Sequence, residues 1–112
     1  MDLPLTEQHG IQIIKLTLPY LDSSTVPKFK SSIPYDSLDA EKIILDLSDL
    51  QFIDSTGLGS IIILNTYLLD KGQRLSLVSA SDQIKSVFSL VKMHKLMPIF
   101  IDIDEAIEEI WT

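Results

Sequence analysis

The residues best suited to chemistry lie in one short segment, Phe52 to Gly59, which reads Phe-Ile-Asp-Ser-Thr-Gly-Leu-Gly. The segment places a carboxylate, two hydroxyls and two glycines between a strand-like apolar run and a helix-like run. The first N–H groups of a helix have no partner within the helix, and the helix dipole adds partial positive charge there. Such a junction favours an oxyanion or a phosphate group. The same residue types are also common helix caps, so the segment alone is consistent with either a site or a cap.

The side chains of this junction have separate expected roles. Asp54 or Ser55 is the expected N-cap of the helix, because short polar side chains accept hydrogen bonds from its first N–H groups. Ser55 and Thr56 supply the two hydroxyls of the segment. Gly57 and Gly59 lack a Cβ and so allow another surface to approach the backbone closely.

Two predicted elements position the junction. Residues 42–47 are a short run of branched apolar side chains, which is typical of a buried strand. Apolar residues then recur at roughly helical spacing from about Ser55 to Asp70, which predicts a helix, and Gly72 is well placed for its C-terminal turn.

The first forty residues predict two strands and a short helix. Residues 3–6 and 11–18 contain apolar runs separated by a glycine turn, which favours an antiparallel pair. Polar residues 22–25 open the helix, Pro27 is tolerated in its first turn, and Pro34 ends it.

The C-terminal third continues the alternation. Residues 74–79 predict a strand, and residues 99–101 predict an edge strand. Ser81-Asp82 caps the helix between them, whose apolar stripe we expect in the core: Ile84, Val87, Phe88 and Val91. Asp102 or Asp104 opens a last helix with these residues expected to face inward: Ala106, Ile107, Ile110 and Trp111.

Strands that alternate with helices predict an α/β fold, with one domain over residues 1–112. The expected architecture is a mixed central sheet of four to five strands with about four α-helices. The expected core includes Leu16, Ile44, Leu45, Leu58, Ile62, Leu77, Val87, Phe88 and Ile107.

Composition limits the function classes. The formal charge of −7 argues against nucleic acid or an anionic membrane as partner, because both need a basic face. There is no cysteine, and His9 and His94 are isolated, so we expect neither a disulfide nor a metal site. No apolar run approaches the ~20 residues that span a bilayer, and the N-terminus does not read as a signal peptide, so we expect a cytoplasmic protein.

The run from Leu45 to Gly59 closely resembles the signature of STAS domains, specifically of the free-standing bacterial anti-sigma-factor antagonists. The resemblance is good from about Lys42 to Trp111, and the first forty residues match only in outline.

The resemblance implies a binding switch rather than an enzyme, with no cofactor. The implied partner is an anti-sigma factor that is also a serine kinase and phosphorylates Ser55, the serine after the signature aspartate; Thr56 is the rival acceptor. A PP2C-type serine phosphatase is the implied counterpart, and a sigma factor is released when the unphosphorylated form captures the kinase. The residues implied in the phosphorylation loop and in partner binding are Asp22, Asp54, Thr56, Gly57, Leu58 and Gly59.

This chain departs from the family pattern at three sites. Between Ser23 and Glu41, Pro27 and Pro34 shorten the first helix relative to that pattern. It has Pro19-Tyr20-Leu21 before Asp22 where the family usually has Gly-Glu-Leu, so capping of the short helix is an equal alternative for Asp22. It has Met93-His94-Lys95 where the family usually has Thr-Gly or Ser-Gly after the third helix.

Several competing functions are weaker or remain open. A hydrolase elbow would need a glycine where Ile53 stands, and a dinucleotide-binding or phosphate-binding glycine motif is incomplete or missing. A receiver-type acceptor at Asp46 or Asp54 would need an acidic pair and a lysine that are not evident. A STAS scaffold of a stress-sensing complex, or an accessory subunit of a membrane transporter, is the remaining alternative.

Overall fold

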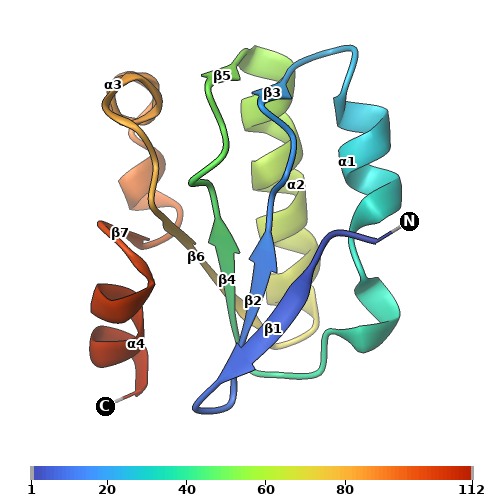
Figure 1. Cartoon of the computed structure of the whole chain (residues 1–112), viewed down its shortest axis with the longest axis vertical. Coiled ribbons are helices and arrows are strands. Elements are labelled where there is room, and N and C mark those ends of the chain that lie inside the picture. Colours follow the sequence, from blue (N-terminus) through green and yellow to red (C-terminus); the bar gives the residue numbers. More distant parts are fainter. Residues whose placement is uncertain (1, 112) are drawn as a thin grey trace.

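The computed structural model describes residues 2–111. It contains a five-stranded sheet in the order β1-β2-β4-β6-β7 and a separate two-stranded sheet of β3 and β5 (Figure 1). The strands are β1 (Leu5–Gln8), β2 (Ile11–Lys15), β3 (Tyr20–Leu21), β4 (Lys42–Asp46), β5 (Phe52–Ile53), β6 (Arg74–Val78) and β7 (Ile99–Phe100). The helices are α1 (Val26–Ser32), α2 (Ser55–Asp70), α3 (Asp82–Leu90) and α4 (Ile103–Trp111), with 3₁₀ turns η1 (Tyr35–Ser37) and η2 (Met93–Lys95).

The main sheet is mixed, as the sequence predicts. Strand β1 is antiparallel to β2, whereas the pairs β2–β4, β4–β6 and β6–β7 are parallel. Parallel strands need crossover connections, and here helices and loops supply them. The α/β prediction with about four helices is confirmed, and β4 occupies the centre of the sheet.

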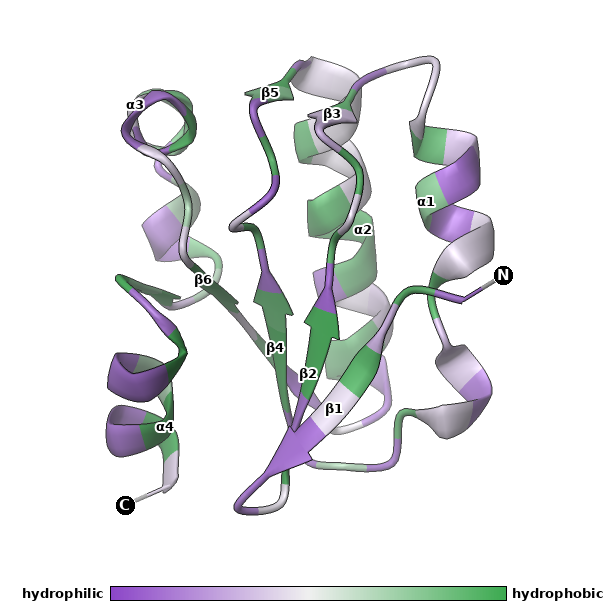
Figure 2. Ribbon diagram, in the orientation of Figure 1, coloured by the Kyte–Doolittle hydropathy of each residue, from purple (hydrophilic) through white to green (hydrophobic). Residues whose placement is uncertain are grey.

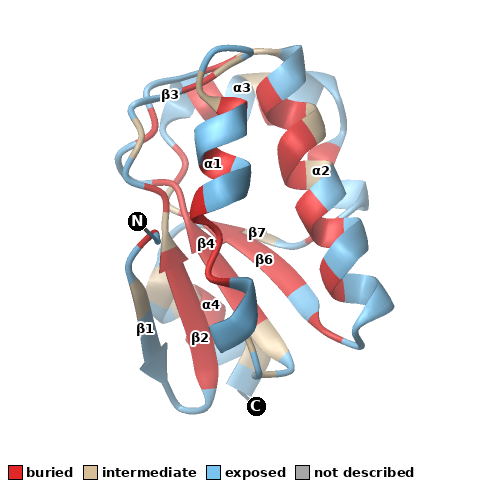
Figure 3. Ribbon diagram, turned by 90° about the vertical axis from the view of Figure 1, so that its right-hand side faces the viewer, coloured by how far each residue is buried: buried red, intermediate tan, exposed pale blue. Residues whose placement is uncertain are grey.

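Helices cover both faces of the sheet (Figures 1 and 3). The larger core joins α1, α2 and α3 to residues such as Ile43 and Leu45 of β4, whereas Ile44 faces a smaller core under α4. This alternation follows from the two-residue period of a strand. Figure 2 shows that α4 is hydrophobic toward the sheet and hydrophilic on its outer side.

Most of the predicted core is confirmed, and four expected positions differ. Ile62 and Val87 are only partly buried at the edge of the core. Val91 is 48% exposed, because α3 ends at Leu90 and the helical stripe does not continue past it. Trp111 was expected to face inward but is exposed, and its ring lies 4.4 Å from the ring of His9 in the β1–β2 turn.

Two buried amides fix the connection that enters β4. The Gln12 side chain donates to a carbonyl at 2.7 Å and accepts from two N–H groups at 2.9 and 2.8 Å, all within residues 37–40. The Gln73 side chain donates to two carbonyls of the same segment at 3.0 and 2.9 Å. These bonds satisfy backbone groups that would otherwise be costly to bury, and they anchor the start of the strand that leads to the junction.

Candidate functional site

The junction lies beyond the carboxyl ends of β2 and β4, where β3 and β5 run side by side (Figure 1). The Gln51 N–H donates to the Pro19 carbonyl at 2.7 Å, and the Asp54 N–H donates to the Leu21 carbonyl at 3.2 Å. These long-range bonds bring residues 19–22 against residues 51–54, so the two segments form one surface at the start of α2.

Asp54 is the N-cap of α2. Its backbone is extended, with φ −108° and ψ −174°, and its carboxylate accepts a hydrogen bond from the Gly57 N–H at 2.8 Å. The second carboxylate oxygen accepts from the Ser23 N–H at 3.3 Å. The Asp54 carbonyl accepts from the Leu58 N–H at 2.9 Å. One residue therefore caps α2 and ties it to the turn before α1, and Ser55 is left out of the cap.

Ser55 is the exposed first residue of α2, and Thr56, also exposed, follows it. Within residues 2–111, the N–H groups of Ser55 and Thr56 have no acceptor, whereas those of Gly57 and Leu58 are bonded to Asp54. The positive end of the helix is thus open to solvent directly beside the Ser55 hydroxyl.

The two glycines of the junction differ in their surroundings. Gly57 is buried, and a Cβ there would collide with the Leu21 carbonyl oxygen and lie 2.8 Å from Cγ1 of Ile53. A Cβ at Gly59 would meet nothing within 4 Å. The close approach expected at both glycines therefore occurs within the chain only at Gly57, where β3 crosses the first turn of α2.

Asp22 organises the turn that leads into α1. One of its carboxylate oxygens accepts from the Ser24 N–H at 2.9 Å, the Ser24 hydroxyl at 2.6 Å and the Thr25 N–H at 3.2 Å. These hydrogen bonds, led by that of the Ser24 hydroxyl, hold the pKa of the Asp22 carboxyl below its usual value. The N-cap of α1 is Thr25, which has no side-chain cap hydrogen bond, so Asp22 holds the turn before α1 and does not itself cap the helix. Asp22 reaches the junction only through its neighbour Ser23.

Acid is expected to remove the contribution of Asp22 to stability. Because folding lowers the pKa of this carboxyl, the contribution is complete above the unfolded value of 3.8 and is lost as the pH falls through the folded value. Asp22→Asn keeps an acceptor but loses the charge, so it should be less stable than wild type at about pH 6, and the difference should shrink as the pH falls below 3.8. Urea unfolding over a pH series measures both proteins; a gap that does not change with pH would contradict this role.

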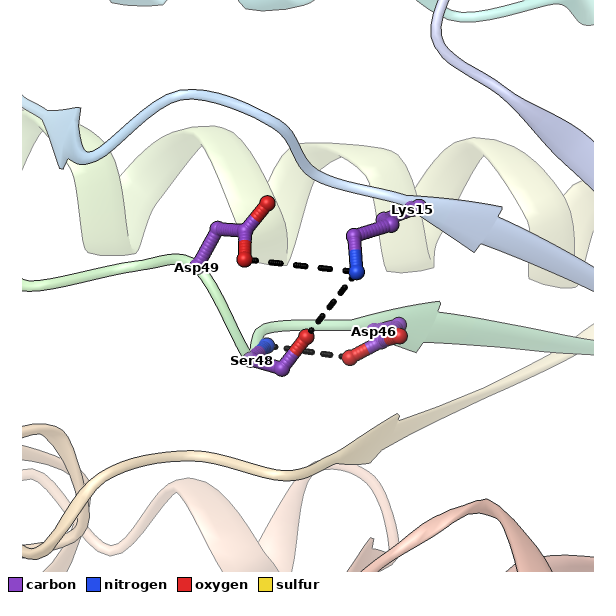
Figure 4. A network of polar contacts seen from close by, with 4 residues as sticks. All are labelled: Lys15, Asp46, Ser48 and Asp49. Atoms are coloured by element: carbon purple, nitrogen blue, oxygen red, sulfur yellow. Dashed lines mark hydrogen bonds and ion pairs between the residues drawn. The ribbon is translucent and has the colours of Figure 1, made fainter.

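A polar network fixes the loop from β4 to β5 (Figure 4). Asp46 is 7% exposed and accepts from the Ser48 N–H at 2.9 Å. The Lys15 ammonium donates to the Ser48 hydroxyl at 3.4 Å and lies 4.0 Å from the Asp49 carboxylate. The sequence analysis passed over Lys15 and Ser48, although the Asp-x-Ser spacing after a strand is a recognisable turn signal. Asp46 therefore stabilises the loop between β4 and β5, which leads to Asp54.

Two exposed aromatic side chains lie next to the junction. Tyr20 and Phe52 are register partners in the β3–β5 pair and are 51% and 50% exposed, whereas Leu21 and Ile53, the next pair, are buried. The sequence analysis noted Tyr20 only as a departure from a family pattern. The signal that could have found this pair is the alternation of exposed and buried residues in two short strands.

Two structural features were not found among the described residues. Among residues 2–111, no group of three or more His, Cys, Asp or Glu side chains could hold a metal ion. In the same part of the chain, no helix is both long enough and apolar enough to cross a membrane.

Curated relatives of the chain include a putative anti-sigma factor antagonist and an anti-sigma F factor antagonist. A putative anti-sigma factor antagonist of Thermotoga maritima is 36% identical over 69 residues, which cover 62% of this chain and 61% of the relative. The chain thus matches about three fifths of that relative. An anti-sigma F factor antagonist of Paenibacillus polymyxa is 29% identical over 106 residues, which cover 89% of this chain and 88% of the relative.

Solved structures and a family comparison agree on the fold. The crystal structure of a putative Thermotoga maritima anti-sigma factor antagonist superposes with a TM-score of 0.83 and 27% identity, covering 98% of this chain and 95% of that chain. A murine Solute Carrier 26 anion transporter gives 0.81 with 20% identity over 93% of this chain and 18% of its own, a likeness of fold alone. The STAS domain family matches residues 2–106, and the chain therefore belongs to the STAS domain family.

Proposed function

We propose that this protein is an anti-sigma-factor antagonist, a binding switch rather than an enzyme, controlled by phosphorylation of Ser55. The observation that carries the proposal is that Ser55 lies exposed at the start of α2, on a turn capped by Asp54 without the Ser55 hydroxyl. The names of the Thermotoga and Paenibacillus relatives support the same role. The partner is an anti-sigma factor that is also a serine kinase, a PP2C-type phosphatase reverses the modification, and the exchange takes place in the cytoplasm.

A phosphate on Ser55 leaves the fold intact. Since the cap is made by Asp54, the modification breaks no hydrogen bond of the described structure. The added charge of about −1.5 to −2 gains roughly 0.3–1 kcal/mol from the helix end. Repulsion by the Asp54 carboxylate is of similar size, about 1 kcal/mol per charge pair at 4 Å in water. The two effects oppose each other, so the stability of the domain should change little.

The same phosphate prevents partner binding. Tyr20 and Phe52 are exposed on the β3–β5 pair, and β5 leads within two residues to Ser55. A partner that uses these aromatic side chains is therefore expected to cover the Ser55 position as well. Burying a phosphate dianion against such a contact costs far more than burying a hydroxyl. The unphosphorylated form is therefore the binding form, and the surrounding contact surface comprises Asp22, Asp54, Thr56 and Gly59. Gly57 and Leu58, which the sequence placed in this surface, are buried and support it from beneath.

Three variants test this switch. Incubation with ATP-Mg²⁺ and the anti-sigma kinase of the source organism should add one phosphate to the wild type and to Thr56→Ala but none to Ser55→Ala. Ser55→Ala should bind the kinase as tightly as wild type, and Ser55→Asp should bind at least about tenfold more weakly, because a carboxylate carries part of a phosphate's charge. Intact-mass measurement and calorimetric titration provide the readouts.

Circular dichroism of each variant is the control for folding. Wild-type-like spectra would attribute a change in affinity to the contact surface rather than to unfolding. Phosphate on Thr56, or wild-type affinity of Ser55→Asp, would contradict the assignment and favour the scaffold or transporter-accessory alternative.

A further inference from the structure

Positive charge is concentrated in one segment of this acidic chain. Residues 83–101 contain Lys85, Lys92, Lys95 and His94 and no aspartate or glutamate, although the chain as a whole has a formal charge of −7. This segment runs from α3 through η2 to β7 and includes no residue of the Ser55 site.

The three lysines are available to a partner. All three are exposed, and none forms an ion pair: across residues 2–111, the recorded pair is that of Lys15 with Asp49. Lys28 and Lys30 of α1 are also exposed without a recorded ion pair, so the distinguishing feature of this segment is that it contains lysines and no carboxylate.

A groove opens beside two of these residues, Lys85 and His94. It has a volume of about 200 Å³ and is lined by Lys85, Phe88, Ser89, His94 and Ile99. Phe88 is buried and Ile99 half-buried, so the groove offers an apolar surface beside an ammonium group and an imidazole. Leu90, at the end of α3, is 83% exposed and adds apolar surface to the same segment.

Lys92 occupies a backbone conformation that suits glycine better. Its φ is +56° and its ψ 44°, in the left-handed region directly after α3. Glycine reaches this region without steric cost, whereas a lysine is strained there. The chain thus carries a charge at a position where glycine would stabilise the fold.

We propose that the groove and its lysines form a docking surface for an acidic amphipathic segment of a protein partner. An apolar anchor of that segment enters the groove beside Phe88 and Ile99, and its carboxylates pair with Lys85 at the groove and with Lys92, which directly precedes η2. Charge complementarity selects this occupant, since residues 83–101 carry three lysines and no carboxylate. A concave apolar groove suits a side chain better than a planar bilayer, and the acidic remainder of the chain would be repelled by anionic lipid.

The probe for this surface is a synthetic peptide in which leucines at helical spacing alternate with glutamates; its glutamine version is the matched neutral control. Amide chemical shifts of the full chain should change around residues 85–99 with the acidic peptide and much less with the neutral one. Lys85→Glu combined with Lys92→Glu should weaken binding at least about tenfold. The matched charge control is Lys28→Glu combined with Lys30→Glu, which reverses two exposed lysines of α1 and should leave the affinity within about twofold.

Lys92→Gly separates binding from folding. It should raise the melting temperature by relieving the left-handed strain and should lower the affinity for the acidic peptide severalfold. If Lys92 had no role in binding, the substitution would raise the melting temperature and leave the affinity for the peptide unchanged.

Four results would overturn the proposal. The first two are chemical shifts around residues 85–99 that do not change at millimolar acidic peptide, or that change as much with the neutral peptide as with the acidic one. The third is a loss of affinity in the α1 control as large as in the Lys85→Glu and Lys92→Glu variant. The fourth is binding of the chain to phosphatidylserine vesicles but not to the peptide. Because no step involves Ser55, the Ser55→Ala and Ser55→Asp proteins should bind the peptide like wild type, so failure of the switch proposal and failure of this proposal remain distinguishable.

Discussion

Gly57→Ala is expected to destabilise the domain by about 1–3 kcal/mol, because the new Cβ cannot fit against β3. It would collide with the Leu21 carbonyl and crowd the Ile53 side chain, and the backbone cannot move away easily. The Leu21 carbonyl accepts a hydrogen bond from the Asp54 N–H, and the Gly57 N–H donates a hydrogen bond to the Asp54 carboxylate. The adjustment must therefore disturb the cap that presents Ser55.

Gly59→Ala is the matched control, two residues further along α2. Its Cβ would enter open space, and alanine is a better helix former than glycine. We expect this variant to be more stable than wild type by roughly 0.5–1 kcal/mol. Urea unfolding of both variants measures the difference; equal effects at the two glycines would contradict the close approach of β3 to α2.

Phe88→Ala is expected to cost about 3–5 kcal/mol, the largest effect predicted for this chain. Phe88 is 2% exposed and lies in the larger core, where its removal loses burial and leaves a cavity. Since a domain of this size has a total stability of about 5–15 kcal/mol, the variant should unfold at a much lower urea concentration.

Val91→Ala is the control for this prediction. Val91 belongs to the same predicted stripe but is half-exposed beyond the end of α3, so its truncation should change stability by less than about 0.5 kcal/mol. A loss below ~1 kcal/mol for Phe88→Ala, or similar losses for both variants, would show that the side chain of residue 88 is not in the core.

The phosphorylation of Ser55 and the substitutions of Gly57 both depend on the hydrogen bonds of Asp54. Asp54 carries the cap of α2, the bond to Ser23 and the link to Leu21. A rigid cap keeps Ser55 in one place whether or not it is modified, so phosphorylation can act on the partner rather than on the fold. Variants that loosen the cap should therefore affect both stability and recognition of Ser55.

Local signals in the sequence determined the four helices, the strands of the main sheet and the position of the candidate acceptor, whereas the two-residue strands β3 and β5 were not predicted. The helix expected from about Ser55 to Asp70 has these bounds in the structure, because its start and end depend on nearby residues. Asp54 caps the start, and Gly72, with φ +77°, follows the end. Caps, turns and apolar periodicity act over a few residues, so a sequence displays them directly.

Only the tertiary structure decided the features that depend on distant segments. The need for glycine at position 57 comes from the Leu21 carbonyl, and the pairing of Tyr20 with Phe52 comes from the register of β3 and β5. Trp111 lies against His9 instead of in the core, although its place in the helical stripe predicted burial. Such contacts join residues far apart in the chain, and their geometry depends on how the helices and strands pack, which periodicity does not encode.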